Sequence, residues 1–141
     1  MEDTTVRASN FITLRNDYGS TFDGKIVIKN CVFEPQTQLW SKSELIYAKN
    51  DCTHDYGYLC RFPEIEIDGL LIKDANATTG YQGIYILPVY TEGNAWNTAP
   101  EKTKYYTPES ISLKGIVSES GLKYKICRTP ELYPNLKVEE K

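Results

Sequence analysis

The sequence lacks any apolar run approaching the roughly 20 residues that a membrane-spanning helix needs. Residues 1–10 also contain no apolar segment of the kind found in a secretory signal. There is no basic excess either, because 16 Lys and Arg stand against 19 Asp and Glu, for a net charge of -3. Membrane insertion, secretion through this end and binding to the phosphate backbone of nucleic acids are therefore disfavoured.

Residues for metal and cofactor chemistry are also scarce. No Walker A, Gly-rich dinucleotide, HExxH, GxSxG or EF-hand pattern occurs, so no cofactor is expected. Cys52, the single histidine His54, and Cys60 could supply three zinc ligands, but a structural zinc site usually has a fourth ligand and a short paired spacing such as C-x2-C. We interpret these residues as a loop histidine with two packed cysteines, with zinc as the alternative.

What is present favours strands. The chain has 141 residues, 40% of them apolar, which is enough for one domain with a core that needs no disulfide. It contains 12 Ile and 13 Thr against 6 Ala, a balance typical of strands. No segment shows a sustained helical spacing of apolar residues, whereas several short stretches alternate with period two. The sequence therefore predicts an all-β fold.

Three predicted strands resemble one another. They align without a gap as KIVIKNCVF (25–33), EIEIDGLLI (64–72) and SISLKGIVS (110–118). Their first inward residues are Ile26, Ile65 and Ile111, which we predict to stack in one column. The sixth position holds Asn30, Gly69 and Gly115. Asn and Gly tolerate positive φ at low cost, so each nonapeptide predicts a strand, a corner and a second strand.

A second type of strand alternates with the first. Its members are FITLR (11–15), LIYAK (45–49), IYILP (84–88) and YKICR (124–128). The period is about 40 residues, which indicates a solenoid, a propeller or an array. A propeller needs four strands per repeat and a recurring aromatic signature, which Trp40 and Trp96 do not provide. We therefore favour a solenoid, with a small β-sandwich as the alternative.

KIVIKNCVF resembles a coil segment of the right-handed parallel β-helix of pectate-lyase-like proteins. The resemblance implies three to four irregular coils in one domain of residues 1–141, with residues 1–9 and 131–141 as caps or tails. A chain this short could also be a piece of a longer solenoid, since each coil buries its faces only against its neighbours.

The longer segment NFITLRNDYGSTFDGKIVIKNCVF (10–33) resembles the β-helical domains of bacteriophage and prophage tail, tailspike and appendage proteins. The resemblance implies a structural or receptor-binding part of a virion, found in the bacterial cytoplasm before assembly. Its implied partners are a host cell-surface glycan or other virion proteins. A homotrimer is implied by the same analogy.

A carbohydrate-active enzyme, a polysaccharide hydrolase or lyase, is the alternative function. Asp17 and Asp55 occupy the same place in two similar pentapeptides, RNDYG (15–19) and THDYG (53–57). If those segments stack in register, the two carboxyl groups lie about 5 Å apart, close to the separation in a retaining glycosidase. Asp-Tyr-Gly is also an ordinary turn sequence, in which Asp caps the backbone and Gly takes positive φ.

Aromatic residues are the better candidates for ligand contact. Rings with polar tips suit sugar faces and protein interfaces, although they also cover the ends of coils. We predict ligand contacts at Tyr18, Tyr56, Trp96, Tyr105 and Tyr106. Others in the same class are Trp40, Tyr47, Tyr58, Tyr81, Tyr85 and Tyr90. The segment 87–109 is the longest excursion from the repeat, and a loop of that length is usually functional or mobile. Glu64, Glu66 and Asp68 alternate with inward isoleucines and are interpreted as a solvated strand face.

Overall fold

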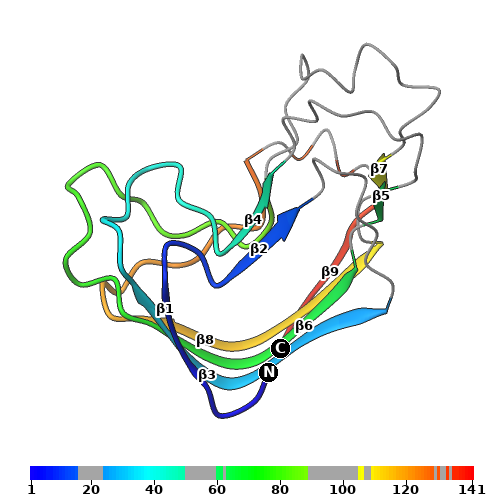
Figure 1. Cartoon of the computed structure of the whole chain (residues 1–141), viewed down its shortest axis with the longest axis horizontal. Helices are drawn as coiled ribbons and strands as arrows, with labels where there is room; N and C mark the ends of the chain where they lie inside the picture. The colour runs from blue at the N-terminus through cyan, green and yellow to red at the C-terminus, as the bar shows by residue number, and fades with distance from the viewer. Residues whose placement is uncertain are drawn as a thin grey trace.

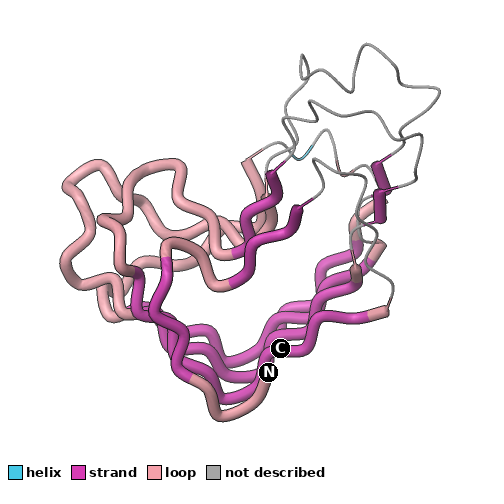
Figure 2. The backbone as a smooth tube through the Cα atoms, viewed as in Figure 1, coloured by secondary structure: helices cyan, strands magenta, loops and turns pink. Residues whose placement is uncertain are grey.

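The computed structural model describes residues 1–15, 24–49, 60–61, 63–88, 105–106, 109–128, 130, 133 and 135–141. In this part of the chain the named elements are all strands, and none is an α-helix (Figure 2). The prediction of an all-β fold is confirmed. No helix in the described ranges is long and apolar enough to cross a membrane.

The main sheet has five strands. Across the sheet they follow the order β1 (Thr5–Ala8), β3 (Lys25–Pro35), β6 (Glu64–Ile72), β8 (Ser110–Ser118) and β9 (Lys137–Glu140). Each neighbouring pair is parallel, and the strands lie almost over one another in Figure 1. After each excursion the chain therefore returns to add a strand to the same edge. The described strand pairs are all parallel, which contradicts the antiparallel β-sandwich alternative.

The second type of strand forms its own ladder. In it, β2 (Ile12–Arg15) pairs in parallel with β4 (Ile46–Lys49). Outside this strand type, β5 (Cys60–Arg61) pairs in parallel with β7 (Tyr105–Tyr106) in a separate two-stranded sheet. Tyr85 extends the ladder through parallel bridges to Glu44 and Lys125. Two of the registers follow the sequence alignment, but Tyr85 pairs with Glu44 where the alignment places Ile46. A shift of two residues keeps the same side chains on the same face of a strand, so the apolar pattern does not detect it.

The core contains the predicted columns. Ile26 pairs with Ile65 and Ile65 with Ile111, so the predicted stacking is confirmed. The next inward column consists of Ile28, Ile67 and Leu113, all buried. Apolar side chains at equal positions on parallel strands make continuous contact along the stack, and this burial is the main stabilising force of the sheet.

The corner of each long strand is also where the sequence predicts it. Asn30, Gly69 and Gly115 have φ values of 49°, 88° and 63°, and the long strands bend at one common place (Figure 1). A Cβ atom on Gly69 would lie 2.9 Å from Asn30 Oδ1, so the close approach of neighbouring corners requires glycine there. Asp3, with a φ of 48°, takes the same place on the segment that leads into β1.

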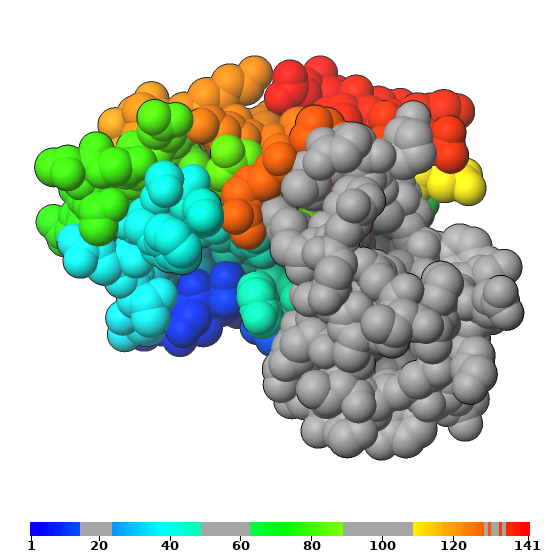
Figure 3. Space-filling model, turned by 90° about the horizontal axis from the view of Figure 1, so that it is seen from above, coloured from blue at the N-terminus to red at the C-terminus, as the bar shows by residue number. Residues whose placement is uncertain are grey.

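The two segments expected as caps or tails each contribute a strand. β1 pairs with β3 and β9 pairs with β8, so they form opposite edges of the main sheet. Figure 3 shows the blue N-terminal residues at one end of the molecule and the orange and red C-terminal residues at the other. The order of the strands in space therefore follows their order in the sequence.

Candidate functional site

Most residues that the sequence singles out lie outside the described residues. These are Asp17, Tyr18, Cys52, His54, Asp55, Tyr56 and Trp96. Cys60 is described only as backbone of β5, where it pairs with Tyr105 of β7, and Arg61 pairs with Tyr106. Within the described ranges, no group of three or more His, Cys, Asp or Glu could hold a metal ion. The zinc, carboxylate-pair and aromatic hypotheses at these positions stay predictions.

The described surface has two hollows that merit comparison. The first, which we call the charged face, is a groove of about 380 Å³ over the outward residues of β6 and β8 and their neighbours on β3 and β9. Glu64, Glu66 and Asp68 all line it, on the side of β6 opposite to the buried Ile65 and Ile67. This agrees with their interpretation as a polar strand face.

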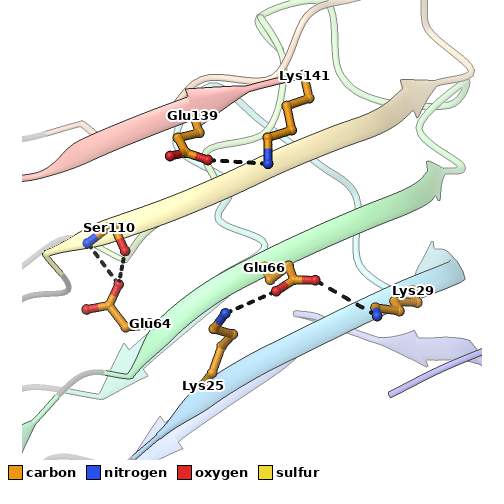
Figure 4. Close-up of polar contacts among 7 residues, drawn as sticks. All are labelled: Lys25, Lys29, Glu64, Glu66, Ser110, Glu139 and Lys141. Carbon is orange, nitrogen blue, oxygen red and sulfur yellow. Dashed lines mark hydrogen bonds and ion pairs between the residues drawn. The ribbon is translucent and has the colours of Figure 1, made fainter.

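Lysines flank the carboxylates of the charged face. Glu66 lies between Lys25, at 3.1 Å, and Lys29, at 3.9 Å (Figure 4). On the other side, Lys114 Nζ lies 3.1 Å from an Asp68 carboxylate oxygen. Because these side chains are partly exposed, each pair contributes at most about 1 kcal/mol to stability. The pairs join β3 to β6 and β6 to β8, so the charges on this face form ion pairs between neighbouring strands.

Glu64 is held by the neighbouring strand as well. It accepts hydrogen bonds from Ser110 Oγ at 2.7 Å, from the Ser110 N–H at 2.8 Å and from the Glu109 N–H at 3.1 Å (Figure 4). Burial raises the pKa of Glu64, but these hydrogen bonds outweigh it and hold the pKa below its ordinary value. A general acid for glycoside cleavage needs a raised pKa, so Glu64 is unsuited to that role.

The second hollow, which we call the Trp40 pocket, is about 260 Å³ in volume. It is lined by Ser9, Asn10, Thr37, Trp40, Lys42, Ser43, Glu44, Tyr47 and Arg128. Trp40 is 54% exposed and Tyr47 is 42% exposed, whereas Tyr81, another ring of the predicted aromatic class, is buried. The pocket thus presents two large rings to solvent beside polar and charged groups.

A tight turn holds Trp40 at the surface. The Ser43 N–H donates to the Trp40 carbonyl at 3.0 Å, and the Trp40 N–H donates to Ser43 Oγ at 2.9 Å. The preceding residue, Leu39, is buried, and its carbonyl accepts from the Thr78 N–H at 3.0 Å. Because Leu39 points into the core and the turn closes on itself, the indole ring of Trp40 is left on the outside.

Groups from three distant parts of the sequence meet in this pocket. Glu44 is only 7% exposed, and its carboxylate accepts a hydrogen bond from Arg128 Nη2 at 2.7 Å. Asn10 Nδ2 donates to the Glu44 carbonyl at 2.7 Å. Arg128 Nε is buried, and among the described residues it has no hydrogen-bond partner. A buried donor without a partner costs about 1–3 kcal/mol, so this nitrogen is a destabilising feature beside the pocket.

Sequence reasoning includes Trp40 and Tyr47 among many aromatic residues but misses Arg128 and Glu44. The two charged residues are 84 positions apart, and no local pattern connects them. What distinguishes Trp40 from Tyr81 is exposure, which depends on the turn and the packing around it. The nearest signal in the sequence is the alternation of the two strand types, because YKICR (124–128) contains Arg128 and LIYAK (45–49) begins directly after Glu44.

Comparison of the chain with protein-family models, with curated proteins and with solved structures finds no match in any of the three.

Proposed function

We propose that this chain is a non-enzymatic parallel β-helix module that binds a glycan in the Trp40 pocket. Three observations support the β-helix. The strands of the main sheet are parallel and follow their sequence order, the columns of isoleucine stack as the repeat predicts, and the corners share positive φ. Both strand types recur along the stack, as successive coils of a solenoid would require.

The observation that carries glycan binding is that two exposed rings and a fixed ion pair line the same hollow. Trp40 and Tyr47 offer apolar faces with polar edges, which suit the apolar face of a sugar ring. Arg128 donates and Glu44 accepts, so together they match a pair of neighbouring hydroxyl groups. A concave site with large rings and a few oriented polar groups is the usual form of a small-ligand pocket.

Two further observations favour binding without catalysis and suggest a setting. The described carboxyl groups whose pKa is displaced, Glu34, Glu64 and Glu140, are all displaced downward, so none of them is prepared to act as a general acid. The resemblance of segment 10–33 to β-helical phage domains suggests a tail or appendage of a phage or prophage. In that setting the module binds a host cell-surface glycan or another virion protein, as one subunit of a homo-oligomer.

Binding is tested by calorimetric titration with purified bacterial O-antigen and capsular polysaccharides. We expect Trp40→Ala to weaken binding about tenfold or more, which corresponds to about 1.4 kcal/mol. Leu122→Ala is the matched control, because Leu122 is a 39% exposed apolar residue that does not line the pocket. Equal binding by wild type and Trp40→Ala, or no binding to any polysaccharide, would overturn the proposal.

The enzyme alternative is tested in the same samples by chromatography of the polysaccharide after incubation. Binding without release of oligosaccharides supports the proposed function. Release that is lost in both Asp17→Asn and Asp55→Asn would replace it with a polysaccharide-cleaving activity.

A further inference from the structure

The main sheet has two half-covered edges. On one side, β1 covers residues 32–35 of β3; on the other, β9 covers residues 110–113 of β8. Among the described residues, no strand pairs with the open side of residues 25–28 or of residues 115–118, although the Met1 ammonium donates to the Val27 carbonyl at 2.7 Å. We propose that copies of this chain associate head to tail, with β1 of one copy completing the open edge of β8 in the next. This proposal is independent of glycan binding.

The peptide N–H and C=O groups on the open edges of β1 and β8 lie at positions where they can pair with each other. The Val32 N–H donates to the Thr4 carbonyl at 2.9 Å and the Gln36 N–H to the Ala8 carbonyl at 3.0 Å. Peptide groups alternate sides along a strand, so those of Thr5 and Arg7 point to the open edge of β1.

The peptide groups of β8 alternate sides in the same way. The Glu119 N–H donates to the Ile72 carbonyl at 2.9 Å, so the peptide groups of Ile116 and Ser118 point away from β6. Thr5, Val32, Leu71 and Val117 form one row across the sheet. If the register continues, Thr5 of the next copy lies beside Val117, and its peptide groups meet those of Ile116 and Ser118.

Side chains on the joint are complementary. Glu34 pairs with both Arg7 and Lys73. The hydrogen bond and charge of Glu34 raise the pKa of Lys73, and the charge of Glu119 adds to this in a lesser degree. Arg7, Glu34, Lys73 and Glu119 therefore alternate in sign along one row, and Arg7 of the next copy would continue the alternation. Val117 is 58% exposed, and stacking would cover it.

Glu140 and Lys141 compete with the incoming copy. Glu140 pairs with Leu113, and the Lys141 N–H donates to the Leu113 carbonyl at 2.9 Å. Glu2 pairs with Lys29, and Lys29 lies in the row of Asp68 and Lys114. Met1 and Glu2 of the next copy therefore need the places that Glu140 and Lys141 occupy.

The incoming residues suit those two places better. The column of Ile28, Ile67 and Leu113 is apolar, so Met1 continues it and the carboxylate of Glu140 does not. Glu2 would bring a carboxylate beside Lys114, whereas Lys141 places a like charge beside Lys114 and the two repel each other. Displacement costs the hydrogen bond from Tyr124 Oη to Glu140, at 2.7 Å, and stacking also brings Lys25 near Lys137. Association is therefore expected to be weak, and Glu140 and Lys141 limit it.

Sedimentation velocity over a concentration series tests the proposal. The wild type should form an open-ended series of oligomers that grows with concentration, because a head-to-tail contact does not close. A variant without Glu140 and Lys141 should reach the same state at about tenfold lower concentration. Monomers at every concentration for both proteins, or a closed dimer for both, would overturn the proposal.

Proline variants locate the joint. Thr5→Pro and Ser118→Pro each remove an N–H from one open edge, where proline is tolerated, so each should abolish self-association, while Thr5→Val should behave as the wild type. Each proline variant keeps the other edge intact, so a mixture of the two should form a one-to-one heterodimer. That recovery excludes misfolding as the cause of the loss. Oligomers of unchanged size in Thr5→Pro, or two proline variants that stay monomeric when mixed, would contradict the joint described above.

Discussion

The charged face and the Trp40 pocket are both hollows on the surface of the protein, but they differ in how far their polar groups are bound to other groups of the protein. On the charged face, Glu66 is bound by two lysines and Glu64 by Ser110 and the neighbouring backbone. In the Trp40 pocket, two rings are exposed and Arg128 Nε has no described partner. The larger hollow is the one whose charges already satisfy one another.

The difference shows that the larger of two hollows on a sheet need not have the more available polar and aromatic groups. Parallel strands in register bring outward residues of neighbouring strands close together, so lysines and carboxylates form ladders that stabilise the stack. A ligand on the charged face would have to replace those contacts. In the Trp40 pocket it would cover two exposed apolar rings, and that burial favours binding.

The largest expected effect comes from the column beneath the charged face. Ile67→Ala removes a fully buried side chain between Ile28 and Leu113, and should lower the free energy of unfolding by about 2–5 kcal/mol. Urea denaturation measures the loss. Leu122→Ala is the control, because Leu122 is exposed and should change stability by less than about 0.5 kcal/mol. Equal losses in the two variants would show that the columns are not the core.

Arg128→Gln should have the next largest effect, and on both stability and binding. It leaves the buried Glu44 carboxylate without the donor it has from Arg128 Nη2, so we expect a loss of about 1–3 kcal/mol in the free energy of unfolding. Polysaccharide binding by the folded variant should also fall about tenfold. If the variant loses stability but keeps full affinity for the polysaccharide, the ion pair between Glu44 and Arg128 is not part of the binding site.

Glu64→Gln should have the smallest effect on stability, and it tests the charged face instead of the Trp40 pocket. The hydrogen bonds to Glu64 lower its folded pKa, so its stabilising effect is present above its unfolded pKa of about 4.3 and is lost as the pH falls through the folded pKa. At pH 7 the variant should be less stable by up to about 1 kcal/mol, and the difference should shrink below about pH 4. Binding should not change; weaker polysaccharide binding would assign the charged face to the site.

The parts of this structure that a short pattern encodes could be predicted from the sequence. The nonapeptides give the columns of Ile26, Ile65 and Ile111 and the corners at Asn30, Gly69 and Gly115, because alternation and positive φ are local properties. Asp3 was not predicted as a corner, since the segment before β1 does not share the nonapeptide. The pairing of Tyr85 with Glu44 differs from the alignment by two residues, which leaves the faces unchanged.

The binding site was less predictable for a physical reason. It depends on which rings are exposed and on an ion pair between residues 44 and 128, and both follow from packing between strands far apart in the sequence. The aromatic content of the chain predicts a binding surface in general terms. It does not separate the exposed Trp40 from the buried Tyr81, because both are rings in segments that lie between strands.

The most direct test of the account is the ¹H–¹⁵N NMR spectrum of the protein during titration with a polysaccharide that it binds. We expect the signals of the Trp40 indole N–H and of the Lys42, Ser43 and Arg128 amides to shift in proportion to occupancy, while those of Glu64, Glu66 and Ser112 stay in place. Shifts confined to the charged face, with the Trp40 indole unchanged, would contradict it.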